Sequence, residues 1–371
     1  MTAPVDVIVV GAGFAGVLIA HNLARQGISV LVLDRAPAYP NVLRAEKIEI
    51  DQAAVLRRLG ALDCRLPCAQ PVGQTVNFSR ERHEPHDTRE QYGIDYRETV
   101  NNMRERLLTG VEFRVEEIQG IRSSEQTQTV RTRSGQILEC RLLILATGGN
   151  AKLLAALGLH RHVDASLRSL TFGFDVVARD GGTPRVTGFN YFPDATHDRV
   201  DYLTLFPVGS RVRANLFTQW QPRSSEFKRM STSPEDVLAR NFPRLEENIG
   251  PFRIGGKLQF FSTQFYRLAR SRVAGVVVVG DEYQSVCPAT GTGLSKVLND
   301  SALLVEHWVP AWLSTPGMGA SKIRQFYADP AKRAVDDDAL DRWRYYRDRL
   351  ATPLQVRAYQ IRDAARRLLR R

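Results

Sequence analysis

Strand-length apolar runs open the chain and return toward its far end. Residues 5–10 are almost continuously apolar, which is typical of a buried parallel strand, and residues 14–25 repeat apolar side chains at helical spacing. Residues 29–33 predict a second strand that ends at Asp34. This succession predicts a strand–helix–strand unit at the start of the chain. The apolar run at residues 273–279 predicts another central strand of a parallel sheet.

The middle of the chain alternates between apolar and polar positions, and its segments carry many β-branched and aromatic residues, which predicts an antiparallel sheet. The strands of this sheet are expected at residues 170–177, 185–192, 201–207, 211–220 and 256–266. Helical spacing predicts helices at residues 46–62, 96–108, 293–308, 338–350 and 353–370. Shorter strands are expected at residues 111–118, 129–132 and 142–146.

These patterns predict an α/β fold in which a Rossmann-like unit is interleaved with an antiparallel sheet, because no low-complexity linker separates the two. The Rossmann-like unit is expected to comprise residues 1–70, 95–165 and 267–315. The antiparallel sheet, a candidate substrate-binding unit, is expected to comprise residues 71–94 and 166–266, and a C-terminal helical region residues 316–371.

Composition narrows the class of protein. With 371 residues, 43% of them hydrophobic, the chain can bury a large core, and its apolar runs are too short for a signal peptide or a membrane span. We therefore expect a cytoplasmic protein without an integral membrane segment. The net charge of +11 is concentrated toward the C-terminus, but no nucleic-acid motif accompanies it, so we expect a solvated basic face and no nucleic-acid partner.

The four cysteines form no CxxC pair and no metal-ligand spacing with histidines, so we expect no metal site. Cys64, Cys68, Cys140 and Cys287 are interpreted as reduced structural thiols. Cys287 lies beside a glycine-rich segment and is a candidate for lining a cavity.

A GxGxxG segment follows the first strand and opens the first helix: Gly11, Ala12, Gly13, Phe14, Ala15 and Gly16. Gly11 allows a tight turn, Gly13 allows the backbone to approach a pyrophosphate, and Gly16 allows close helix–strand packing. The helix N-terminus offers N–H groups to the phosphates, and Asp34 can accept hydrogen bonds from a ribose. The segment predicts dinucleotide binding. Arg35 is either a contact to adenine or phosphate or a surface arginine.

A second glycine-rich segment follows the strand predicted at residues 273–279. Gly280 and Asp281 end this strand, and a turn leads into the next helix through Pro288, Gly291, Thr292, Gly293 and Leu294. The segment resembles that of flavoprotein monooxygenases of the para-hydroxybenzoate hydroxylase type, the group A flavoprotein hydroxylases. The resemblance implies that FAD is the cofactor, that Asp281 binds its ribityl chain, and that the turn faces the flavin pyrimidine ring. There a helix N-terminus stabilises the negative charge of reduced flavin.

Other segments are similar to the same family, less specifically. Arg44 stands where the family has an arginine that contacts FAD, and Arg104 lies on a helix similar to the one whose polar face follows the cofactor. The resemblance also implies that Val115, Thr147 and Gly148 contact FAD.

One departure concerns the electron donor. Thr147 and Leu154 stand where the family carries an aspartate and an arginine that serve the flavin and the nicotinamide surface. Lys152 is either a substitute phosphate contact or a surface lysine. We therefore expect either weak use of NAD(P)H or reduction by a separate flavin reductase.

The resemblance implies an FAD-dependent monooxygenase that hydroxylates or epoxidises an aromatic or polyketide-like small molecule. It implies that one atom of molecular oxygen is inserted through a flavin C4a-hydroperoxide. The flavin carries this chemistry, so no catalytic side chain is identified. Substrate-contact candidates lie in the predicted sheet, where they are alternatively core residues: Phe172, Phe174, Tyr191, Tyr202, Leu205, Phe206, Phe217 and Gln219.

Three alternatives stay open. A reductase of the geranylgeranyl-reductase type shares both glycine segments. A flavin-dependent halogenase is less favoured, because the chain lacks a tryptophan-x-tryptophan-x-isoleucine-proline run. A non-catalytic flavin-binding protein would use the basic C-terminal helices as its partner surface.

Overall fold

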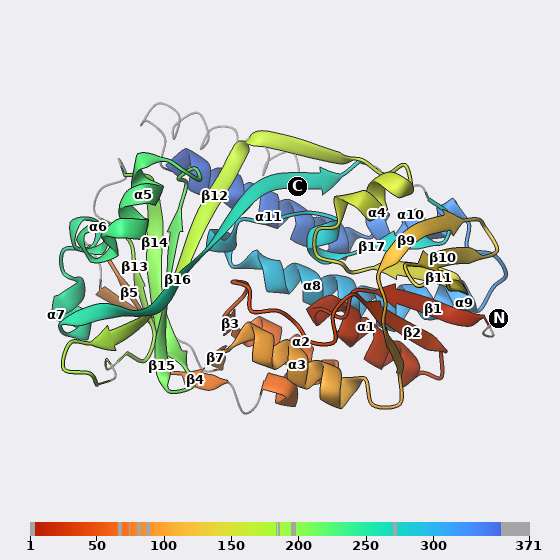
Figure 1. Cartoon of the computed structure of the whole chain (residues 1–371), viewed down its shortest axis with the longest axis horizontal. Coiled ribbons are helices and arrows are strands. Elements are labelled where there is room, and N and C mark those ends of the chain that lie inside the picture. The colour runs from red at the N-terminus through yellow and green to blue at the C-terminus, as the bar shows by residue number, and fades with distance from the viewer. Residues whose placement is uncertain are drawn as a thin grey trace.

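The computed structural model describes residues 4–65, 69–73, 75–79, 83–86, 90–182, 184, 186–193, 198–269 and 273–349. It confirms the predicted fold class. An α/β unit and a second, mostly antiparallel sheet lie at opposite ends of an elongated molecule (Figure 1). The helix predicted at residues 353–370 and Cys68 lie outside the described residues.

The first sheet has seven strands in the order β8-β2-β1-β11-β10-β9, with β17 paired to β11. Its strands are β1 (Val5–Val10), β2 (Val30–Asp34), β8 (Glu112–Val115), β9 (Ile118–Ser123), β10 (Gln128–Thr132), β11 (Ile137–Leu145) and β17 (Val276–Val278). Strands β8, β2, β1, β11 and β17 are parallel. Their carboxyl ends therefore share one edge, where both glycine segments begin.

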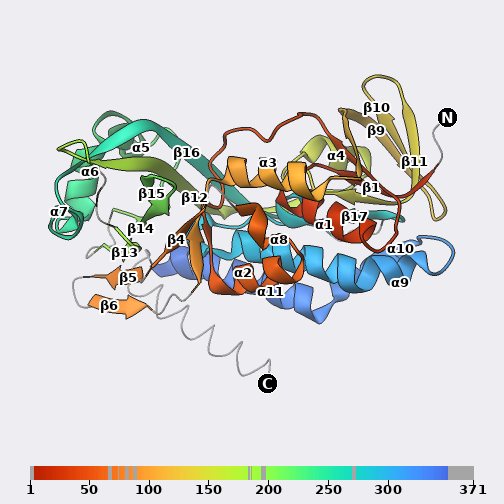
Figure 2. The same ribbon diagram turned by 90° about the horizontal axis from the view of Figure 1, so that it is seen from below.

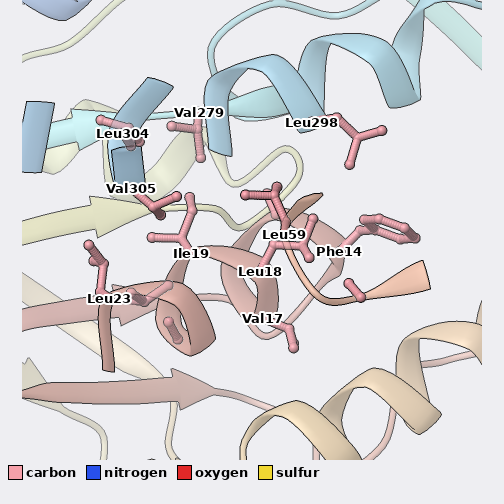
Figure 3. Close-up of a cluster of buried hydrophobic side chains, with 14 of the residues drawn as sticks. Phe14, Val17, Leu18, Ile19, Leu23, Leu59, Val279, Leu298, Leu304 and Val305 are labelled. Carbon is pink, nitrogen blue, oxygen red and sulfur yellow. The ribbon is translucent and has the colours of Figure 1, made fainter. Parts of the chain in front are cut away.

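Helices cover one face of this sheet: α1 (Phe14–Ala24), α2 (Ile50–Arg58), α3 (Tyr96–Leu107) and α8 (Thr292–Leu303). A continuous apolar core fills the space between them, and Figure 3 shows Leu18 and Ile19 of α1 among Leu298, Val305 and Val279. The opposite face packs against α4 (Ala151–Ala156) in a second core. The predicted βαβ start is thus confirmed.

Several predicted elements differ in their limits, and three of them lie in the α/β unit. The helix expected from residue 46 begins with β3 (Lys47–Ile48), and α2 starts only after Glu49, which forms a reciprocal capping box with Gln52. The strand expected at residues 111–118 is two strands, because β8 pairs with β2 whereas β9 pairs with β10. The helix expected to end before Pro310 continues through a π-helical turn into α9 (Val309–Leu313), where Pro310 lies in the first turn and needs no hydrogen-bond partner.

The second sheet has seven strands in the order β16-β12-β15-β14-β13-β5-β6. They are β5 (Thr75–Phe78), β6 (His83–His86), β12 (Arg161–Ala178), β13 (Phe189–Tyr191), β14 (Val200–Val208), β15 (Arg211–Thr218) and β16 (Phe252–Leu268). All pairs are antiparallel except β13 with β5. Both segments predicted for this unit, residues 71–94 and 166–266, contribute strands to the sheet. The exact boundaries of the unit stay a prediction.

The outer face of the second sheet carries three helices that the sequence reasoning missed: α5 (Ser225–Thr232), α6 (Pro234–Asn241) and α7 (Leu245–Ile249). They lie against the strands (Figure 1), and a core rich in aromatic side chains is buried between them. The inner face looks toward the first unit. A small sheet of β3, β4 (Gln70–Val72) and β7 (Gln91–Gly93) lies between the two units.

The C-terminal part forms α10 (Ala320–Ala328) and α11 (Pro330–Arg349), so α11 starts earlier than predicted. Helix α11 lies along α8 and contacts β12 and the turn Pro288–Thr290, so it joins the two units (Figure 2). Among the described residues, none of the helices combines the length and the apolarity needed to cross a bilayer.

Candidate active site

Three glycines form the turn between β1 and α1, and they are required for different reasons. Gly11 has φ +99°, and a Cβ there would lie 2.5 Å from the Ala146 carbonyl oxygen. A Cβ on Gly16 would lie 1.8 Å from the Gly11 carbonyl oxygen. Gly13 has φ −78°, and the nearest atom to a Cβ there belongs to the Tyr39 ring, 3.8 Å away. Close packing within the chain therefore explains why positions 11 and 16 require glycine. It does not explain Gly13, where the space beside the backbone suits the approach of a cofactor.

Asp34 and Arg104 hold the same turn in place. The Asp34 carboxylate accepts hydrogen bonds from the backbone N–H groups of Ala12 (2.7 Å) and Ala36 (2.9 Å) and from Arg104 Nη2 (3.0 Å). Arg104 also donates to the carbonyl oxygens of Ala12 (2.7 Å) and Ala36 (3.0 Å). All three guanidinium nitrogens of Arg104 thus donate hydrogen bonds to protein atoms, and these bonds position the turn.

A cavity of about 520 Å³ lies between the second glycine segment and the inner face of the second sheet. This volume is in the range of small-molecule sites. Its cofactor side is lined by Arg44, Asp281, Pro288, Gly291, Gly293 and Leu294. Gly291 has φ +67° and stands at the N-cap of α8; it has no side chain to cap the helix, and the Thr292 N–H donates to Thr290 Oγ1 at 3.3 Å. The other N–H groups of the first turn can serve an electron-rich ring edge.

Arg44 and Asp281 set the electrostatics of this side. Burial raises the pKa of Asp281, and the positive charges of Arg44 and Lys296 oppose that rise. Burial lowers the pKa of Arg44, but Asp281, Tyr39 and Tyr96 outweigh burial and raise it overall. The Arg44 guanidinium also lies over the Phe261 ring, 4.5 Å from its centroid. Arg44 is therefore a fixed cation beside the cavity.

A buried carboxylate, Glu282, occupies the turn in which the sequence departs from the family. Glu282 accepts hydrogen bonds from the Thr147 hydroxyl, from the N–H groups of Gly149 (2.7 Å) and Asn150 (2.5 Å), and from Arg161 (2.9 Å). Glu282 is 1% exposed. The Thr147 hydroxyl and the N–H groups of Gly149 and Asn150 are therefore used inside the protein. Sequence reasoning did not single out Glu282, because only the fold brings it to residues 147–150.

Strand alternation decides which residues of the second sheet reach the cavity. On β14, Tyr202 and Phe206 line it together with Thr204, and Phe217 of β15 lies beside them. The candidates Phe172, Phe174, Tyr191 and Leu205 point to the opposite face, where they form the core beneath α5–α7. Gln219 is buried and donates to Asp201 Oδ2 at 2.6 Å.

The other sequence candidates have mixed positions. Phe14 and Ala15 are buried in the first turn of α1, and the Thr292 hydroxyl pairs with that of Thr290. Arg35 and Val115 are exposed and do not line the cavity. Gly148 lies in the turn bound by Glu282, with φ +71°. Cys287 is fully buried, and burial raises its pKa to about 12, which keeps it a thiol.

The cavity also contains residues that sequence reasoning missed. Glu46 lies at its edge, where burial raises the Glu46 pKa although Arg213 donates to the carboxylate at 2.8 Å. Asn215 and Thr204 line the sheet side, and Tyr346 of α11 closes the end. Thr204 lies two residues after Tyr202 on β14, so the sequence pattern could have indicated that this polar residue shares the cavity face with Tyr202. No local sequence pattern indicated that α11 reaches the cavity.

The fold and the site define a dinucleotide-binding flavoprotein. Two helix N-termini have a glycine at the N-cap, Gly13 for α1 and Gly291 for α8, and space is left beside Gly13. These features fit FAD, with its pyrophosphate at α1 and its flavin at α8. Residues 4–308 match the family described as FAD binding domain, so the chain belongs to this family. The predicted FAD cofactor, the resemblance to group A flavoprotein monooxygenases and the class of FAD-dependent oxidoreductase are confirmed.

Three similar proteins illustrate the range of relatives. Squalene epoxidase of Schizosaccharomyces pombe is 23% identical over 328 residues, covering 82% of this chain and 69% of that protein. Rifampicin monooxygenase of Streptomyces venezuelae is 27% identical over 164 residues, 42% of this chain and 34% of that protein, so the chain matches about a third of its length. The solved flavin-dependent brominase Bmp2 has a TM-score of 0.74 and 14% identity, with 99% of this chain and 93% of that chain covered. The last likeness shows the fold alone.

Proposed function

We propose that this protein is an FAD-dependent monooxygenase that inserts one oxygen atom into an aromatic or polyketide-like small molecule. The observation that carries the proposal is a row of aromatic rings that lines the cavity beside the flavin turn. Tyr202 has ring centroids of Phe192, Phe217 and Tyr346 at 5.3, 4.6 and 5.9 Å. Such a row suits a flat, electron-rich substrate.

Tyr202 joins this aromatic row to the cofactor side. Its hydroxyl donates to the Ala289 carbonyl oxygen at 2.7 Å, within the turn Pro288–Thr290. A substrate held against Tyr202 therefore lies next to the flavin edge. Burial raises the pKa of Tyr202 well above its usual value, so the phenol stays neutral.

The chain's own residues bind, orient and exclude water. FAD, when bound, supplies the activation of molecular oxygen and the transfer of one of its atoms. The N-terminal turn of α8 stabilises negative charge on the flavin pyrimidine, and Arg44 adds a fixed positive charge. The aromatic row keeps the cavity apolar on the substrate side, which protects a reactive cofactor from water.

The electron donor belongs to the same proposal. Glu282 already occupies the N–H groups of residues 149 and 150, so these two donors are not available to a nicotinamide phosphate. This supports weak use of NAD(P)H or reduction by a separate flavin reductase. Anaerobic mixing with NADH or NADPH measures it directly: slow bleaching of FAD supports the proposal, and fast bleaching at micromolar NADPH contradicts it.

The reaction is tested with chemically reduced, FAD-loaded protein. Isotopically labelled oxygen gas is added with a panel of neutral aromatic compounds, and products are analysed by mass spectrometry. A product that gains one labelled oxygen atom supports the proposal. A product that gains hydrogen, or a halogen when halide is present, would instead support a reductase or a halogenase, and cofactor reoxidation without any product across the panel would count against all three.

Tyr346 offers a matched pair with its neighbour. We expect Tyr346→Ala to weaken binding of an aromatic ligand about tenfold, because it removes one ring of the row at a cost near 1.4 kcal/mol. Tyr345 is 48% exposed and does not line the cavity, so Tyr345→Ala should bind normally. Both variants should retain wild-type FAD content. Titration followed by FAD fluorescence measures the two affinities, and equal losses in both variants would remove α11 from the site.

A further inference from the structure

A second row of side chains crosses the sheet next to the aromatic row, and it is polar. Asn190 pairs with Thr204, and Thr204 pairs with Asn215, across strands β13, β14 and β15. All three residues line the cavity. The cavity wall therefore has an aromatic strip beside the flavin turn and a polar strip one pair further along the strands.

Two polar atoms of this row are buried without a hydrogen-bond partner. Thr204 is 8% exposed and Asn215 is 6% exposed, and neither Thr204 Oγ1 nor Asn215 Oδ1 is bonded. An unsatisfied buried polar atom costs free energy unless a ligand restores the bond. Thr263 also has an unpartnered hydroxyl but does not line the cavity. The combination of an unpartnered atom with an open cavity is what points to a ligand.

Glu46 fixes which end of the Asn215 amide faces the ligand. The Asn215 side chain lies close enough to Glu46 that a hydrogen bond from it lowers the carboxyl pKa against the effect of burial, and the carboxylate also accepts from Arg213 Nε at 2.8 Å. A carboxylate ion-paired with Arg213 only accepts hydrogen bonds, so the Asn215 amide nitrogen is the atom that can donate to Glu46. Asn215 Oδ1 is then left as an acceptor and requires a donor on the ligand.

The charges nearby disfavour an anionic ligand at this row. Arg213 is fully engaged: besides Glu46 it donates to Asp175 at 3.3 Å and to Gln259 at 2.6 Å. A substrate carboxylate at Asn215 would meet an acceptor oxygen and the Glu46 carboxylate, and Arg213 beside them is already paired with Glu46 and Asp175. An uncharged hydroxyl donates to Asn215 Oδ1 and accepts from Thr204 Oγ1 at once.

We propose that Thr204 and Asn215 are specificity-determining residues that bind an uncharged hydroxyl or N–H group on the substrate and select against a carboxylate, with Glu46 as the positioning residue that orients the Asn215 amide. This assignment rests on the proposed function, because it assumes that the substrate occupies the cavity beside the flavin.

The test is a binding titration on the oxidised, FAD-loaded protein, followed by the flavin absorbance. Four ligands with one ring system are compared: naphthol, its methyl ether, naphthalene and naphthoate. We expect naphthol to bind at least about tenfold more tightly than the other three, as hydrogen-bonding sites reject analogues that leave them unpaired. Tighter binding of naphthoate, equal binding of naphthalene, or no binding of any of the four would overturn the proposal.

Isosteric variants assign the preference to residues. Thr204→Val and Asn215→Leu should each lower naphthol affinity about tenfold and leave naphthalene affinity unchanged. Thr263→Val makes the same change in the same sheet outside the cavity and should behave as wild type. Thermal melts report whether each variant is folded; if Asn215→Leu is unfolded, Thr204→Val alone decides.

Glu46→Gln tests orientation, because a glutamine can either donate to or accept from Asn215. We expect the Glu46→Gln variant to have a smaller preference for naphthol over its methyl ether, because the ether oxygen can only accept a hydrogen bond and a turned Asn215 amide could donate one. Loss of packing alone would not produce this effect. An unchanged preference would remove Glu46 from the assignment. These titrations measure binding alone and do not depend on a reaction with oxygen. If the protein prefers the hydroxyl ligand here but inserts no labelled oxygen in the reaction test, the proposed function is contradicted and this inference stands.

Discussion

Gly13→Val is expected to leave the protein folded and to abolish FAD binding. The backbone at Gly13 is extended, with φ −78° and ψ −170°, so a side chain causes no left-handed strain. A Cβ there meets nothing closer than the Tyr39 ring at 3.8 Å. We propose that the backbone approaches the FAD pyrophosphate in this space, so the valine methyl groups would exclude the cofactor. We expect affinity to fall by more than about a hundredfold, or about 2.8 kcal/mol.

Two other glycines are the controls for this variant. Gly16→Ala places a Cβ 1.8 Å from the Gly11 carbonyl oxygen and should destabilise the turn itself. Gly120 lies on β9, where a Cβ meets only the end of the Arg131 side chain at 3.7 Å, so Gly120→Val should retain both fold and FAD. The FAD-to-protein ratio and the thermal melt separate the three cases. A Gly13→Val protein with full FAD content would show that the pyrophosphate lies elsewhere.

The parts of the fold that local pattern determines could be predicted from the sequence. The turn at Gly11 to Gly16 joins a buried strand to a helix within one short segment, and its spacing alone fixes its geometry. Strands β12 and β16 extend beyond their predicted ends because they pair with each other along most of their length. Such long-range pairing extends strands through sequence that carries no strong local signal.

The substrate side could be predicted only in part, because the second sheet is covered on both faces. Phe174 and Tyr191 are as apolar as Phe206 and Tyr202, but the former pack beneath α5–α7 and the latter face the cavity. Aromatic residues alone therefore cannot tell the faces apart. Likewise, Glu282 and Tyr346 reach the site through tertiary packing that no spacing in the sequence reveals.

A buried network of four charges joins α11 to α8. Lys332 forms ion pairs with Asp300 (2.8 Å) and Asp336 (3.1 Å), and Lys296 pairs with Asp336. Asp300 in turn accepts a hydrogen bond from the Gly280 N–H at 3.0 Å. The network therefore connects the second glycine segment to the helix that carries Tyr346. In the sequence, each helix carries a lysine followed by an aspartate four residues later, Lys296 and Asp300 on α8 and Lys332 and Asp336 on α11. This spacing places the two residues of each pair on one helical face.

Lys332→Met is expected to destabilise the protein by about 3–5 kcal/mol, because the buried Asp300 carboxylate loses its lysine partner and Asp336 keeps Lys296 alone. Although burial lowers the Lys332 pKa, Asp300 and Asp336 raise it overall, so the native lysine is charged. Asp338→Ala breaks the Arg342–Asp338 pair of the same helix, which is 57% and 52% exposed, and should cost less than about 1 kcal/mol. Chemical denaturation, followed by circular dichroism and FAD release, compares the two variants. Equal midpoints would mean that the network does not hold α11 on the flavin-binding unit, whereas early FAD release in Lys332→Met alone would show that the helix and the cofactor site depend on one another.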